Sequence, residues 1–155
     1  MIEIYAKPAI FQQMMDLVNK NTTEVGWYGV CERDGDDVEI IEILEYPQRK
    51  SATRVTTKGV PEYDEWLINL PVEKANKIRF AGHSHVNMPA VPSTIDIADE
   101  KTTLSQLDED DYYIFFILNK RGEWDLRIHE NGEVQHAHSQ RWWKMEAENE
   151  PVESA

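Results

Sequence analysis

The segment GHSHVNMPAVPSTID contains two histidines and an aspartate whose spacing suits a metal ion. Alternate side chains of a strand share a face, so His83 and His85, at the end of the apolar run IRFAG, are expected to point the same way. Asp96 follows Pro92 and Ser93, which mark a helix start, and a first-turn carboxylate can reach back over the strand end. Two imidazoles and one carboxylate form a zinc site with one position left for water, as a catalytic site requires.

Hydrolysis of an amide at such a site also needs a group that moves protons. A bound zinc ion polarises a carbonyl and lowers the pKa of its water to roughly 7. A side chain must then take the proton of the water and pass it to the departing nitrogen. Glu24 is the candidate for this general acid/base, although a lone glutamate near a strand is more often a solvated surface acid.

Together these residues resemble the motif of the JAMM metalloproteases, also called JAB or MPN-plus domains. That motif is an upstream Glu followed by His-x-His, seven residues, Ser, two residues and Asp. In this chain the matching residues, each at the family spacing, are Glu24, His83, His85, Ser93 and Asp96. The resemblance covers most of residues 1–120 and implies a JAB1/MPN-like fold with the layering of cytidine deaminases.

The same resemblance implies a role for each matching residue. His83, His85 and Asp96 would be the ligands of Zn²⁺, Glu24 the general acid/base, and Ser93 the donor that stabilises the oxyanion. Family members cut peptide or isopeptide bonds, including those of ubiquitin-like modifiers. Many eukaryotic members have proline after the second histidine, where this chain has valine, which favours a prokaryotic or phage branch.

Simpler explanations exist for parts of this pattern. Ser93 and Asp96 also form a plain capping box, in which they only satisfy free amides at a helix start. A second His-x-His, His136 and His138, has no helix with a paired serine and aspartate after it, so a polar strand face explains it better. Non-haem iron also uses two histidines and a carboxylate, but would leave the upstream glutamate and the serine without a role.

Two other functions stay open beside a peptidase or isopeptidase. One is a non-catalytic MPN-type scaffold that binds a protein partner, which the intact set of chemical residues disfavours. The other is a zinc hydrolase of a small amide or cell-wall precursor, as the resemblance to bacterial and phage relatives allows. The sequence leaves the substrate and the oligomeric state undetermined.

Composition excludes several classes of protein. The chain has 155 residues, of which 41% are hydrophobic, enough for one core without disulfides. Its one cysteine, Cys31, cannot form an internal bridge or share a metal with a second thiol. The net charge of −13 opposes binding to nucleic acid, whose phosphates require lysine and arginine. No signal peptide or membrane-spanning run is evident, so we expect a cytoplasmic protein.

Hydrophobic periodicity and turn residues predict an α+β domain, with a mainly antiparallel curved sheet flanked by helices. Helices are expected after Pro8, at 61–70 and after Pro92, and strands at 1–6, 24–33, 38–46, 78–86, 112–120, 123–130 and 134–138. We expect residues 1–144 to form one catalytic domain and 145–155 an acidic, flexible tail. The segment 47–60 has four cations and no acid, and is expected to be a loop or edge that contacts substrate.

Overall fold

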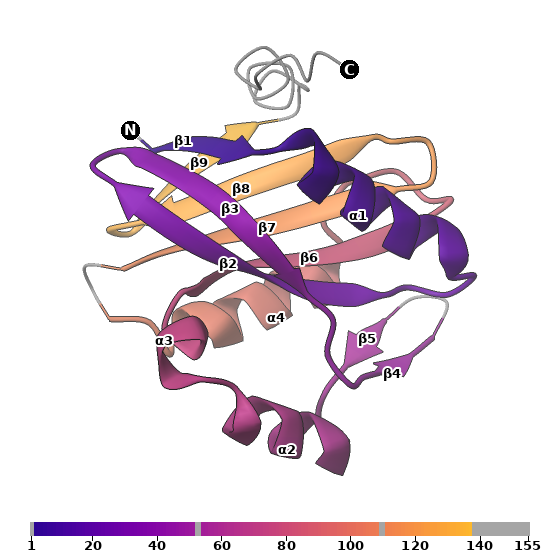
Figure 1. Cartoon of the computed structure of the whole chain (residues 1–155). Coiled ribbons are helices and arrows are strands. Elements are labelled where there is room, and N and C mark those ends of the chain that lie inside the picture. Colours follow the sequence, from indigo (N-terminus) through magenta and orange to yellow (C-terminus); the bar gives the residue numbers. More distant parts are fainter. Residues whose placement is uncertain (1, 52–53, 109–110, 138–155) are drawn as a thin grey trace, which may run out of the picture.

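The protein has an α+β fold built on one large sheet (Figure 1). The computed structural model describes residues 2–51, 54–108 and 111–137. The strands of the large sheet are β1 (Glu3–Ala6), β2 (Gly26–Asp34), β3 (Asp37–Leu44), β6 (Ile78–Val86), β7 (Tyr112–Asn119), β8 (Trp124–Glu130) and β9 (Glu133–Ala137). The other elements are α1 (Pro8–Lys20), β4 (Arg49–Lys50), β5 (Val55–Thr56), α2 (Pro61–Asn69), α3 (Val72–Ala75) and α4 (Thr94–Leu104).

The strand order of the sheet is β1-β3-β2-β6-β7-β8-β9. Four neighbouring pairs are antiparallel, whereas β1 pairs with β3 and β6 pairs with β7 in parallel. The predicted hairpin is confirmed: β2 and β3 pair around Gly35, whose positive φ of 62° suits the tight turn. The predicted meander is also confirmed, with positive φ at Gly122, Asn131 and Gly132 in its turns.

One face of the sheet forms the hydrophobic core with α1. Met14, Leu17 and Val18 lie on one side of this helix, at the predicted helical spacing, and are buried in the core cluster. Trp27 from β2 lies against β6 so closely that a Cβ at Gly82 would be 2.3 Å from the indole nitrogen. Only glycine therefore fits at position 82, beside His83, without displacing this ring.

The opposite face carries α4, α2 and an aromatic cluster. Tyr28 of β2 stacks on Tyr46 with a centroid distance of 4.3 Å, and Tyr63 and Trp66 of α2 complete the cluster. The hydroxyl of Tyr46 occupies the space that a side chain at Gly26 would need, 2.2 Å from an added Cβ. These rings fix α2 over the sheet, although no residue of α2 is fully buried.

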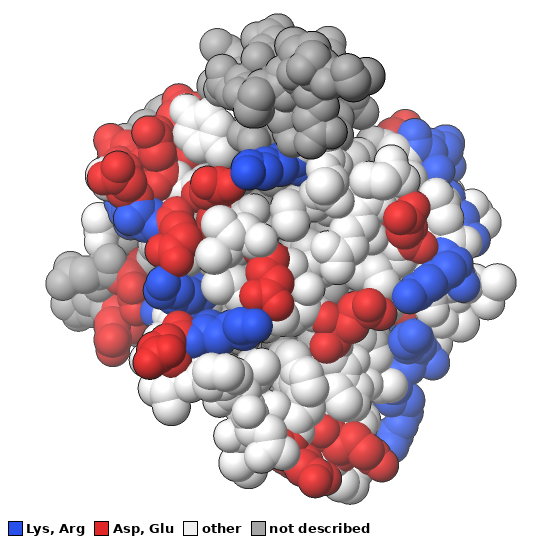
Figure 2. All heavy atoms as spheres, in the orientation of Figure 1, with Lys and Arg blue, Asp and Glu red and all other residues white. Residues whose placement is uncertain are grey.

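The basic segment 47–60 forms more structure than a loop, because β4 and β5 pair as a separate two-stranded sheet. Figure 2 shows lysine and arginine side chains gathered along the edge of the molecule where Figure 1 places these strands. No helix in the described part of the chain is long and apolar enough to cross a membrane. The expected tail, the domain end at 144 and His138 lie outside the described residues.

Candidate metal centre

The two histidines lie at the end of β6 and face the same side of the sheet, as their alternate positions predict. The centroids of the His83 and His85 rings are 5.1 Å apart. Nδ1 of His85 is 2.8 Å from the carbonyl oxygen of Pro89, which can only accept, so Nδ1 holds the proton and donates it. This hydrogen bond fixes the ring and leaves Nε2 of His85 as the atom that can bind a cation.

Asp96 reaches both rings from the first turn of α4. Its Oδ2 atom is 2.9 Å from Nε2 of His85, and its Oδ1 atom is 3.1 Å from Nε2 of His83. The capping box also exists: the Ser93 amide donates to Oδ2 of Asp96 at 2.8 Å, and the Asp96 amide donates to Oγ of Ser93 at 3.1 Å. The box turns the Asp96 carboxylate back over the strand end, so the structural and metal-binding explanations are compatible.

Protonation in this group follows from burial and close contacts. Burial opposes ionisation of Asp96, but the two histidines that contact it outweigh burial and hold its pKa well below its usual range. Burial also opposes the charged form of His85, yet its contacts with Asp96 and the Pro89 carbonyl raise its pKa. A cation at Nε2 must displace that proton, so metal affinity falls as the pH drops.

The donor set fits a cation on an observation independent of the sequence motif. Nε2 of His83 is buried and lies 3.1 Å from Oδ1 of Asp96, but it makes no well-aligned hydrogen bond among the described residues. A buried polar atom with such incomplete pairing costs free energy. A metal ion bound to this nitrogen, to Nε2 of His85 and to Asp96 would remove that cost.

Glu24 completes the group from the segment before β2. A strand was expected to begin at Glu24, but β2 begins two residues later. The Glu24 side chain is buried rather than solvated, with 3% of its surface exposed. The neighbouring amide, that of Val25, donates to Oγ of Ser84 at 3.0 Å, and the Ser84 amide donates to the Val25 carbonyl at 2.9 Å. Ser84, on the face of β6 opposite the histidines, therefore holds the segment that carries Glu24.

The two carboxylates differ in the role that their surroundings favour. One oxygen of Glu24 lies within 4.8 Å of a nitrogen of both His83 and His85, so distance alone would also admit Glu24 as a ligand. Burial raises the pKa of Glu24, and the two histidines only partly offset this. A carboxylate with a raised pKa suits a general acid/base, whereas Asp96, which stays ionised and contacts both rings, suits a ligand.

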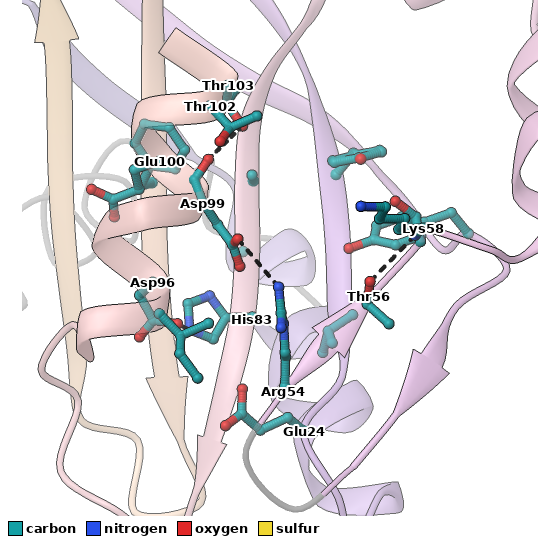
Figure 3. A pocket seen from close by; sticks show the side chains of 18 residues that line it. Glu24, Arg54, Thr56, Lys58, His83, Asp96, Asp99, Glu100, Thr102 and Thr103 are labelled. Carbon is teal, nitrogen blue, oxygen red and sulfur yellow. Dashed lines mark hydrogen bonds and ion pairs between the residues drawn. The ribbon is translucent and has the colours of Figure 1, made fainter. Parts of the chain in front are cut away.

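A cavity of about 480 Å³ opens beside this group, between α4 and the β4–β5 hairpin (Figure 3). Glu24, His83 and Asp96 lie on its wall, together with the rings of Tyr28, Tyr46 and Phe115. Arg54 of the hairpin spans the cavity to Asp99 of α4, with 3.7 Å between Nη2 and Oδ1. A substrate in this cavity would lie directly beside the candidate metal site.

Among the described residues, His136 belongs to no second group of side chains that could hold a metal ion, and His138 lies outside those residues. Nε2 of His136 pairs with a carboxylate oxygen of Asp125, and the His129 ring packs edge-on against Phe115 at 5.4 Å between centroids. Arg127, which the sequence did not single out, is buried between Asp125 and α4. Charged residues alternate with tryptophan, leucine and isoleucine in β8, which is the pattern of a strand with one solvated face, so nothing in the sequence indicated that Arg127 is buried.

Comparison with known proteins supports the fold and leaves the chemistry open. No family model matches the sequence, and a search of curated proteins finds no significant match. The solution structure of protein DSY2949 from Desulfitobacterium hafniense is similar, with a TM-score of 0.60 and 17% identity over 87% of this chain and 90% of that one. The chain is thus an α+β protein with a mostly antiparallel sheet and a candidate centre of two histidines and two carboxylates.

Proposed function

We propose that this protein is a zinc-dependent hydrolase of amide bonds. The observation that carries the proposal is that the Nε2 atoms of His83 and His85 meet at the Asp96 carboxylate, at 3.1 and 2.9 Å, with Glu24 beside both rings. More particularly, we propose a JAMM-type metallopeptidase or isopeptidase with a JAB1/MPN-like fold. The match of five residues to that motif supports this assignment, as does their convergence from three separate segments.

The chemistry follows from the roles that the residues can fill. A zinc ion held by His83, His85 and Asp96 would act as a Lewis acid for the carbonyl and as a source of acidified water. Glu24 would accept the proton of the attacking water and deliver it to the departing nitrogen, a task suited to a buried carboxylate with a raised pKa. Burial of Glu24 and His85 also lowers the local dielectric constant, which strengthens these electrostatic interactions.

Ser93 can cap the helix and assist the reaction with the same hydroxyl. Its oxygen accepts from the Asp96 amide at 3.1 Å, and a hydroxyl that accepts in this way still has one proton to donate. We therefore expect Ser93→Ala to lose about 10²-fold in kcat through loss of an oxyanion donor, and about 1 kcal/mol of stability through loss of the cap. Ser93→Gly should keep most of the stability and remain slow.

Thermal melts and kcat for both variants test this prediction. Glycine retains much of the backbone preference of an N-cap, so comparison of the two variants separates the cap from the chemistry. A lower melting temperature with kcat within about threefold of wild type, which is under about 0.7 kcal/mol, would mean that Ser93 only caps α4.

Only part of the basic segment lies where a bound substrate would be. Arg54 and Lys58 line the cavity, whereas the ammonium group of Lys50 contacts Asn21 at 3.1 Å outside it. We expect Arg54→Glu/Lys58→Glu to raise KM for a protein substrate several-fold more than for a short peptide. Charge reversal of Arg49 and Lys50 is the matched control, and we expect it to change KM for the protein substrate less. Equal effects of both pairs on both substrates would contradict substrate contact by the cavity residues.

The proposal as a whole is tested by a cleavage screen with the purified protein. The substrates are ubiquitin-like fusions, isopeptide-linked conjugates, unrelated peptides and small amides that include cell-wall fragments. Cleavage of a peptide or isopeptide bond that a chelator abolishes and added Zn²⁺ restores would support the proposed function. Cleavage of small amides alone would favour the second class of substrate, and a zinc-loaded chain that cleaves nothing would favour the scaffold.

A further inference from the structure

The helix that carries Asp96 is attached to the sheet in an unusual way. The structure describes all of α4, and the one buried residue of this helix is a charged one, Glu100. Two of its isoleucines, Ile95 and Ile97, are 41% and 44% exposed. Surface helices normally bury an apolar stripe, so non-directional apolar packing contributes little to the position of α4.

Charged contacts replace that stripe. Nη2 of Arg127 on β8 pairs with Oε1 of Glu100, while Nη1 donates to Oδ2 of Asp125 at 2.5 Å. The exposed fractions of these three residues are 7%, 9% and 1%, so the network lies between α4 and the sheet. Because a guanidinium group is planar with donors in fixed directions, two simultaneous contacts define both its place and its orientation.

The network lies one helical turn from the candidate metal ligand. Glu100 follows Asp96 by four residues, so both project from the same side of α4, whereas Asp99 projects toward Arg54 (Figure 3). Because the helix turn between them is rigid, a contact that fixes Glu100 also fixes the position of Asp96. Metal ligands must lie within about 0.2 Å of their preferred distances, so a small displacement of α4 would move Asp96 out of range.

A contribution to folding stability alone does not explain the buried pair of Arg127 and Glu100. Removing two charges from water is costly, and apolar residues of similar volume are often as good or better at such positions. We propose that Arg127, oriented by Asp125, is a positioning residue that holds α4 through Glu100 so that Asp96 lies over His83 and His85. This inference rests on the proposed zinc site, and it adds a residue that the sequence motif does not contain.

The test measures zinc affinity, by competition with a chelator of known affinity, and thermal stability of the same proteins. Arg127→Met alone would leave Glu100 buried and unpaired, so misfolding would confound it. The decisive variant is Arg127→Met/Glu100→Met, which removes both charges and should fold, because buried Asp125 keeps its contact with His136. Its melting temperature should stay near that of wild type while zinc affinity falls about 10- to 100-fold, as for other residues that orient ligands. Arg127→Lys should recover part of the affinity, because an ammonium group cannot make both contacts with the same geometry.

Arg33→Met is the matched control, because Arg33 pairs with Glu130 at 2.7 Å and stacks on Tyr112 rather than on α4. Its zinc affinity should equal that of wild type. The absorption spectrum of Co²⁺-loaded protein, which reports ligand geometry, should change in the double variant and not in this control. Wild-type zinc affinity in the double variant would overturn the positioning role alone, whereas absence of zinc binding by the wild-type chain would overturn the proposed function as well.

Discussion

Replacing His83 and His85 together with alanine is expected to abolish zinc binding, from about one ion per wild-type chain to near zero. The two rings supply two of the three proposed ligands, and Asp96 alone cannot hold the ion against water. Both rings lie on the face of β6 opposite the core that packs on α1, so the variant should still fold. Metal analysis after dialysis, with a thermal melt of the same sample, measures both properties.

His136→Ala is the matched control for this variant. It also removes an imidazole that contacts a carboxylate, but the ring is 40% exposed and Asp125 keeps its contact with Arg127. This control should retain about one zinc ion per chain in the same metal analysis. Full zinc content in the double-histidine variant would show that the site assignment is wrong. Loss of zinc from the control alone would show that the metal site lies at His136 on β9.

Glu24→Gln is expected to keep both zinc and fold but lose about 10²-fold or more in kcat. Glutamine has the shape of glutamate, and the hydrogen bonds that place this segment come from the backbone of Glu24 and Val25. The amide cannot accept the proton of the attacking water. Steady-state rates at saturating substrate, with metal content measured on the same preparation, separate loss of proton transfer from loss of the ion.

Asp99→Asn is the matched control for this second prediction. Asp99 is an acid that lines the same cavity, but it is 56% exposed and pairs only with Arg54 among the ion pairs described. Its kcat should stay within about threefold of wild type, since an exposed ion pair contributes little. If Glu24→Gln turns over as fast as this control, Glu24 is not the base. If the Glu24→Gln variant loses its zinc, Glu24 is a ligand, as distance alone would permit.

The sequence by itself determined the strands of the large sheet, the three longer helices and the local geometry of the site, but not β4, β5 or α3. Alternation along a strand put His83 and His85 on one face, and the serine-to-aspartate spacing produced the capping box of α4. Turn residues located the hairpin and the meander. These features depend on covalent geometry over a few residues, so they can be derived from spacing without knowing which elements are neighbours.

Only the tertiary structure decided which distant segments meet at the site. Glu24 could be paired with the histidines beforehand only by the family resemblance, because its burial depends on β2 lying beside β6 and on Ser84 holding its neighbour Val25. The contact of Arg127 with Glu100, 27 residues apart, was not expected at all. Such contacts depend on strand order and on the packing of α4, which the periodicity of a single element does not encode, because many arrangements of the same elements satisfy the same local pattern.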